Sequence, residues 1–81
     1  MNKYIFEATC LCPNGKLKDR YECELSSRST IQVELIGKYI AKLAKRRMYQ
    51  EQIADELRNE FMAGVRVVGW HYGIKVECVR E

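Results

Sequence analysis

The feature that most constrains the fold is an apolar stripe with helical spacing, from Thr30 to Ala63, that polar side chains interrupt near its middle. Its side chains recur every three or four residues, so they would share one face of a helix. The first half contains Leu35, Ile36, Tyr39, Ile40 and Leu43, and the second contains Ile53, Ala54, Leu57 and Phe61. Between the halves, the same face carries Arg46, Arg47 and Gln50. The helix should therefore bend or make a polar contact at residues 44–50.

A continuous helix over this stripe would be about 50 Å long, whereas a ten-residue strand reaches only about 33 Å. Ser29, with Gln32 three residues later, has the spacing of a capping box, and predicts that the helix begins there. Gly64 suits the left-handed position that ends helices. The mismatch in length and the polar residues favour a break near Arg46–Gln50 or an overhang, but no Gly or Pro marks a break. We therefore predict one long helix, with a kink as the alternative.

Residues 3–25 have the pattern of a β-hairpin. Asn14-Gly15 is a strong signal for a two-residue type I′ turn, whose central positions both need positive φ. This turn pairs Ala8 with Tyr21 and Phe6 with Cys23, which places the apolar side chains together on one face. A slip of one residue would put the two strands' apolar sets on opposite faces, so the pattern and the turn support the same register.

The C-terminal segment 65–79 alternates between apolar and polar residues, as a half-buried strand does. Gly69 and Gly73 either frame a loop between two strands or mark a bulge in one. We predict an α+β fold of ββαβ type: a β-hairpin, the long helix, and one or two C-terminal strands. The helix would form a single layer on a small sheet, and residues 1–81 would form one small domain.

Composition restricts the function without naming it. The 81 residues are 47% hydrophobic and 31% charged, with a net charge of +3, which is typical of a soluble folded protein. The first apolar run, Tyr4–Phe6, is too short for a signal peptide or a membrane span. We therefore expect a cytoplasmic protein without a membrane partner, in which thiols stay reduced.

The four cysteines and the single histidine do not point to chemistry. Cys10 and Cys12 resemble half of a zinc site, but the hairpin register places Cys23 roughly 13 Å along the sheet from Cys10. We therefore expect the cysteines to pack in the core, with no metal and no cofactor. His71 has no local partner that could activate a nucleophile, so we expect no catalytic residues and no enzyme.

The strongest functional signal is a basic flank on the predicted helix, because no acid occurs from Lys38 to Arg47. Its residues are Lys38, Lys42, Lys45, Arg46 and Arg47, with Tyr49 beside them. Such a flank can follow a phosphate backbone while the tyrosine stacks or donates a hydrogen bond. The arginines could instead bind carboxylates of an acidic protein, or the flank could be an ordinary solvated helix face. We expect a non-enzymatic module that contacts nucleic acid.

A protein-interaction module is the alternative. Trp70, His71 and Tyr72 would form an aromatic contact loop, and Ile5 and Leu11 would be exposed on the far face of the sheet. This class includes a small adaptor, an inhibitor of the kind that mobile elements encode, and a homodimer.

Overall fold

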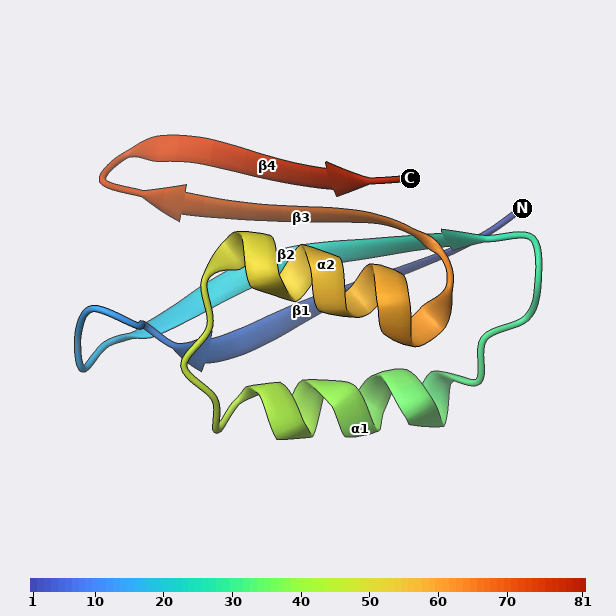
Figure 1. The fold of residues 1–81 in the computed structure, drawn as a ribbon, viewed down its shortest axis with the longest axis horizontal. Helices are drawn as coiled ribbons and strands as arrows, with labels where there is room; N and C mark the ends of the chain where they lie inside the picture. The colour runs from blue at the N-terminus through green and yellow to red at the C-terminus, as the bar shows by residue number, and fades with distance from the viewer.

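A four-stranded antiparallel sheet with two helices on one face makes up the fold (Figure 1). The structure is a computed structural model that describes residues 1–81. Its elements are β1 (Asn2–Leu11), β2 (Lys18–Ser27), α1 (Val33–Leu43), α2 (Gln50–Phe61), β3 (Gly64–His71) and β4 (Ile74–Arg80). The strands lie in the order β1-β2-β3-β4. The predicted α+β class is confirmed, but the ββαβ order with one long helix is wrong in its number of elements.

The predicted hairpin register is confirmed, whereas the predicted turn type is wrong. Ala8 pairs with Tyr21 and Phe6 with Cys23. However, neither Asn14 nor Gly15 has a positive φ. Instead, the Gly15 amide donates to the Cys12 carbonyl over a four-residue turn. Pro13 explains the difference, because its fixed φ suits the second position of a type I turn and its nitrogen cannot donate to a partner strand.

The long helix is broken at residues 44–49, so our prediction of one continuous helix is wrong. This segment pairs with the end of β1: the Leu11 amide donates to the Arg46 carbonyl over 2.8 Å, and the Met48 amide donates to the Leu11 carbonyl over 3.3 Å. These bonds use backbone groups that a continuous helix would have paired internally. Met48 is buried in the core, which fixes the linker against the sheet.

The helix ends also differ from those predicted. α1 begins at Val33 rather than after Ser29, because the buried Ile31 has its amide bound to the Tyr4 hydroxyl and Gln32 is extended. α2 ends at Phe61, and Met62, rather than Gly64, takes the left-handed position with a φ of 51°.

The C-terminal segment forms two strands, which resolves the alternative left open by the sequence. His71 pairs with Ile74 across Tyr72 and Gly73, whose φ angles are 53° and 79°. Positive φ at both central positions is typical of the type I′ turn. Gly69 therefore lies within β3, and Gly73 supplies the turn.

One core lies between the sheet and the helical layer. Its fully buried side chains include Tyr21, Leu25, Leu43, Ile53, Leu57 and Val67. Neither helix is long and apolar enough to span a bilayer.

Candidate nucleic-acid interface

Three chain connections meet at one end of the fold, opposite to the end that holds the two termini (Figure 1, left). They are the β1–β2 loop of residues 12–17, the α1–α2 linker of residues 44–49, and the β3–β4 turn. Arg47 ties the first two together, because its Nη1 donates to the carbonyls of Cys12 and Gly15 over 2.7 Å each. We call this region the loop end.

A hollow of about 260 Å³ opens at the loop end, lined by residues from all three connections and from the adjoining strands and helix. Its polar lining consists of Asn14, Asp19, Gln50, Glu51 and His71, and its aromatic lining of Tyr21, Tyr49 and Tyr72. Ligand pockets for drug-sized molecules are typically about 300–1,000 Å³. The hollow therefore has room for one small planar group rather than an extended molecule.

Gln50 is the most buried of the polar groups that line the hollow, and its side chain makes three hydrogen bonds. It is 3% exposed, and its Nε2 donates to the carbonyls of Val67 and Val76 over 2.9 Å each. Its Oε1 lies 3.0 Å from Nε2 of His71. The two carbonyl acceptors identify the amide nitrogen of Gln50, so the atom that faces His71 is the amide oxygen, Oε1. An amide oxygen can only accept, and the hydrogen of this bond must therefore be on Nε2 of His71. In the neutral ring, Nδ1 is then free to accept a hydrogen bond.

The other polar groups of the hollow are mostly acceptors. Asp19 accepts a 3.4 Å hydrogen bond from the Tyr21 hydroxyl, and the Glu51 carboxylate makes no ion pair. Burial and the nearby Asp19 charge raise the pKa of Tyr21, which therefore stays a neutral phenol. Tyr49 is half-exposed and Tyr72 fully exposed, so both can offer a ring face to a ligand at the rim.

The predicted basic flank does not stay together as an interface. Arg46 makes a bidentate pair with Glu56, with Nη1–Oε1 at 2.6 Å and Nη2–Oε2 at 2.9 Å. The hydrogen bonds from Arg46 hold the pKa of Glu56 below its ordinary value. The acidic half of the predicted helix thus folds back onto the basic half, and it neutralises Arg46.

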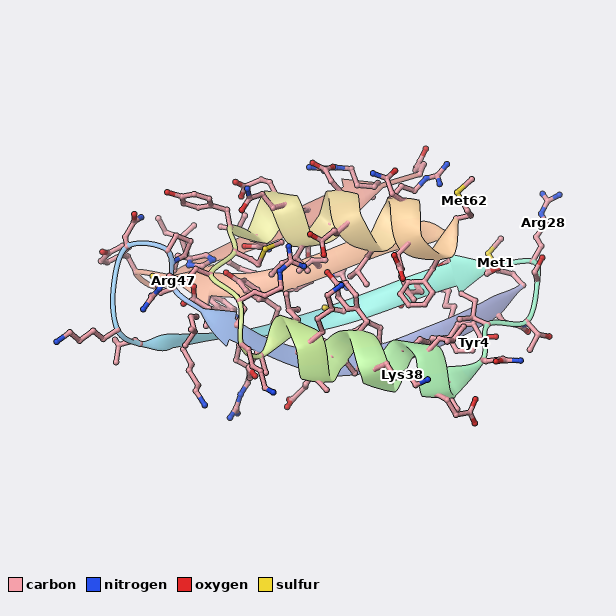
Figure 2. The ribbon with its side chains drawn as sticks, turned by 60° about the horizontal axis from the view of Figure 1, so that its bottom comes forward. Met1, Tyr4, Arg28, Lys38, Arg47 and Met62 are labelled. Atoms are coloured by element: carbon pink, nitrogen blue, oxygen red, sulfur yellow. The ribbon has the colours of Figure 1, made fainter.

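The remaining predicted cations divide into two groups. Lys38 and Lys42 line a hollow between the helices together with Glu56 and Glu60, so acids offset their charge. Figure 2 shows Lys38 towards the end that holds Tyr4 and Met1, whereas Arg47 lies at the loop end. Lys45 and Arg47 lie in the α1–α2 linker, and neither forms an ion pair.

The sequence analysis missed two further cations at the loop end. Lys16 lies in the β1–β2 loop beside the carbonyl that Arg47 binds, and Lys18 pairs with Leu11, the residue bridged to Arg47. Both are exposed and neither makes an ion pair. We define the loop-end cations as Lys16, Lys18, Lys45 and Arg47. Lys18 points to the sheet face away from the helices, like Arg20 and Glu22 two and four residues further on. Only the fold brings the segments that carry Lys16 and Lys18 to the end that holds Arg47, because single lysines in a turn are unremarkable in a sequence.

The side chains of β3 point alternately to the two faces of the sheet, and this separates the residues of the predicted aromatic loop. His71 and Tyr72 line the hollow, and the His71 ring lies 5.8 Å from the Tyr21 ring. Trp70 is 66% exposed beside Glu7, Arg20 and Glu22, which lie on the sheet face away from the helices. The three residues therefore do not form one contact surface.

The cysteines pack in or against the core. Burial raises the pKa of Cys10 and Cys78, and it raises that of Cys23 to about 12, so these thiols are protonated at neutral pH. Cys12 is half-buried at the hollow. No group of three or more metal-binding side chains comes together in the structure.

The Arg46–Glu56 pair gives a testable pH dependence. The pKa of Glu56 lies below its ordinary value of 4.5 in the folded protein, so its stabilisation is present above that pH and is lost as the pH falls further. Glu56→Gln should lower the free energy of unfolding by about 1 kcal/mol or less at pH 7, because both side chains are over a third exposed. Urea unfolding should show a smaller loss at about pH 3. Glu60→Gln, without an ion pair, is the control, and an equal loss from Glu56→Gln at both pH values would contradict the account.

Comparisons with known proteins find a solved structure of similar fold, but they do not identify the function of this chain. No protein-family model and no curated protein matches the chain. The fold is similar to the crystal structure of the archaeosine synthase QueF-Like in its apo form, with a TM-score of 0.87 and 19% sequence identity. The match covers 98% of this chain and 89% of that chain. At this identity the likeness shows a shared fold, and the fold therefore also occurs in a protein named as a synthase.

Proposed function

We propose that this chain is a small binding module for single-stranded nucleic acid, with the loop end as its interface. The observation that carries the proposal is a hollow with room for one ring and with tyrosines at its rim, at the same end of the fold as four cations that no carboxylate pairs. The proposal keeps the ligand class predicted from the sequence. It moves the interface from the whole helix flank to the loop end.

The loop-end cations would contact phosphates. Lysines in exposed positions act as mobile positive charges that follow a phosphate backbone. Arg47 is held by two backbone carbonyls, which are neutral, so its charge remains available. Asp19 and Glu51 offset part of this charge, but they line the hollow, where a base rather than a phosphate would lie.

The hollow would hold one base. Single-stranded nucleic acid exposes unstacked bases, which proteins bind by stacking on aromatic rings and by hydrogen bonds to the base edges. Tyr49 and Tyr72 offer stacking faces. Asp19, Glu51 and Nδ1 of His71 offer acceptors for the amino and imino hydrogens of a base.

The solved structure of similar fold is also compatible with the proposed class of ligand. An archaeosine synthase of the same fold is consistent with a nucleic-acid-related role for this architecture. For this chain we propose binding rather than catalysis, because three of its four thiols are buried and protonated. Cys12, at the hollow, has no hydrogen-bonded base. The cytoplasmic localisation expected from the sequence stays a prediction.

Two double charge reversals test the interface. Lys16→Glu/Lys45→Glu acts at the loop end, whereas Lys38→Glu/Lys42→Glu acts on the other part of the predicted flank, and both change the net charge equally. By fluorescence anisotropy with a labelled single-stranded RNA of about ten nucleotides at about 50 mM salt, the loop-end variant should bind about tenfold more weakly or worse. The control should stay within about threefold of the wild type. No binding by the wild type, or equal losses in both variants, would contradict the proposal.

A further inference from the structure

The outer edge of β1 offers unpaired backbone groups along most of its length. Even-numbered residues of β1 bond to β2, as the bond from the Cys12 amide to the Leu17 carbonyl shows. Odd-numbered residues therefore direct their N–H and C=O groups away from the sheet. At Leu11 the linker takes both groups. From Lys3 to Thr9 no strand covers the edge, because β1 is the first strand in the sheet order.

An apolar groove runs beside this free edge. A hollow of about 390 Å³ lies between Tyr4–Phe6 of β1 and the residues Val33, Ile36, Gly37 and Ile40 of α1. Val33 is 61% exposed, and a Cβ at Gly37 would meet no atom within 4 Å. Figure 1 shows α1 along β1, on the side of the sheet away from β4. Exposed apolar surface beside an open strand edge is typical of a site where a further strand binds.

We infer that the free edge of β1 pairs antiparallel with the same edge of a second copy of this chain, about a two-fold axis at Ile5. This inference concerns a different surface from the proposed nucleic-acid interface and does not depend on it. An extended strand is the occupant that the edge selects, because only a strand can pair with its alternating N–H and C=O groups.

The side chains of β1 are complementary to themselves in one register. With Ile5 opposite Ile5 of the second copy, Lys3 lies opposite Glu7 and Glu7 opposite Lys3, while Tyr4 lies opposite Phe6 on the helix side. A shift of two residues in either direction places Ile5 opposite a charged side chain, either Glu7 or Lys3. A shift of four residues one way pairs Ile5 with Thr9 and Glu7 with Glu7. A shift the other way pairs Lys3 with Lys3 and brings Ile5 opposite Met1. Opposite charges directly across a strand pair stabilise it, and like charges destabilise it.

The charges of β1 are free for such pairing, whereas those of β4 are not. Lys3 and Glu7 are exposed and make no ion pair. On the other edge of the sheet, Glu77 already pairs with Arg66 and Lys75. Glu7 also lies opposite Glu22 within the chain, a like-charge pair that a second copy's Lys3 would offset. The structure therefore favours β1 over β4 as the self-associating edge.

A charge swap tests the register by sedimentation equilibrium. The wild type should form a dimer, Lys3→Glu and Glu7→Lys should each raise the dimer dissociation constant about tenfold or more, and the double variant should return to within about threefold of the wild type. Lys75→Glu on β4 is the control and should leave the dimer unchanged. Circular dichroism should show that every variant is folded, because all these positions are exposed.

A cysteine at the proposed axis gives a second, independent test. Residues directly opposite in a hydrogen-bonded antiparallel pair have Cα atoms about 5.5 Å apart, which is within the range of a disulfide. Ile5→Cys should therefore form a covalent dimer under mild oxidation, and Val79→Cys on β4, like the wild type, should not. A strict monomer, a dimer unaffected by the Lys3 and Glu7 reversals, or an assembly that responds to the β4 charge instead would each overturn the inference.

Discussion

Replacing Gln50 with glutamate is expected to remove much of the protein's stability at neutral pH. The new carboxylate would lie where the amide now donates to the carbonyls of Val67 and Val76, at a position that is 3% exposed. It would replace two favourable hydrogen bonds with repulsion between oxygens and keep only the hydrogen bond from Nε2 of His71. Burial of a charge with its other partners lost costs up to about 3–5 kcal/mol. A domain of this size has a free energy of unfolding of about 4–12 kcal/mol. The loss therefore removes much of the stability.

The loss from Gln50→Glu should depend on pH in a definite direction. Burial would raise the pKa of the new carboxyl group in the folded state above its unfolded value of about 4.3. The folded state would then favour the protonated form, so the variant should be most stable below about pH 4 and lose stability as the pH rises. Urea unfolding monitored by circular dichroism at both ends of this range measures the effect.

Gln52→Glu is the matched control for this substitution in the same helix. Gln52 is exposed and its Oε1 accepts a 2.9 Å hydrogen bond from the Tyr49 amide at the start of α2. A glutamate there can accept the same bond, and its charge is favourable near a helix N-terminus. It should change the free energy of unfolding by less than about 0.5 kcal/mol. Equal effects of the two substitutions would show that Gln50 is not held as described.

Gly69→Ala should destabilise the protein through a steric clash within β3. A Cβ at this position would lie 2.5 Å from Cδ1 and Cε1 of Tyr21, a ring that is only 2% exposed. The ring is buried and can relieve the clash only by shifting towards the hollow that it lines, and overpacking of this kind typically costs about 1–3 kcal/mol. Chemical unfolding should show a loss in this range.

Two further variants separate the clash from a general effect of removing glycine. Gly15→Ala should be close to neutral, because the nearest atom to its Cβ would be the Cys12 sulfur at 4.0 Å. Tyr21→Leu shortens the side chain that Gly69→Ala would strike, so the double variant should lose less stability than the sum of the single losses. Additive losses would refute the steric explanation.

The hairpin register could be predicted from the sequence because it depends on a local pattern of apolar residues. The alternation of apolar residues from Phe6 to Cys23 defined the hairpin register, because a shifted register would have mixed the two faces. The turn type was missed because Pro13 restricts the loop more strongly than Asn14-Gly15 favours a type I′ turn. The positive φ angles occur instead at Tyr72-Gly73.

The break in the helix and the site depend on contacts between distant parts of the chain. The break is held by bonds from Leu11 to residues 46 and 48, which no local pattern reveals. Gln50 was visible as a polar residue on an apolar stripe, but its partner His71 lies 21 residues away in sequence. Similarly, Arg46 looked free because Glu56 reaches it only after the second helix folds back.

The most direct test of the central claim is an NMR titration of the ¹⁵N-labelled protein with single-stranded RNA. If the loop end is the interface, the largest chemical-shift changes should occur in residues 12–18, 44–51 and 71–73, with small changes at Lys38 and Lys42. Shift changes spread along α1, or confined to the sheet face that carries Trp70, would contradict the proposed interface.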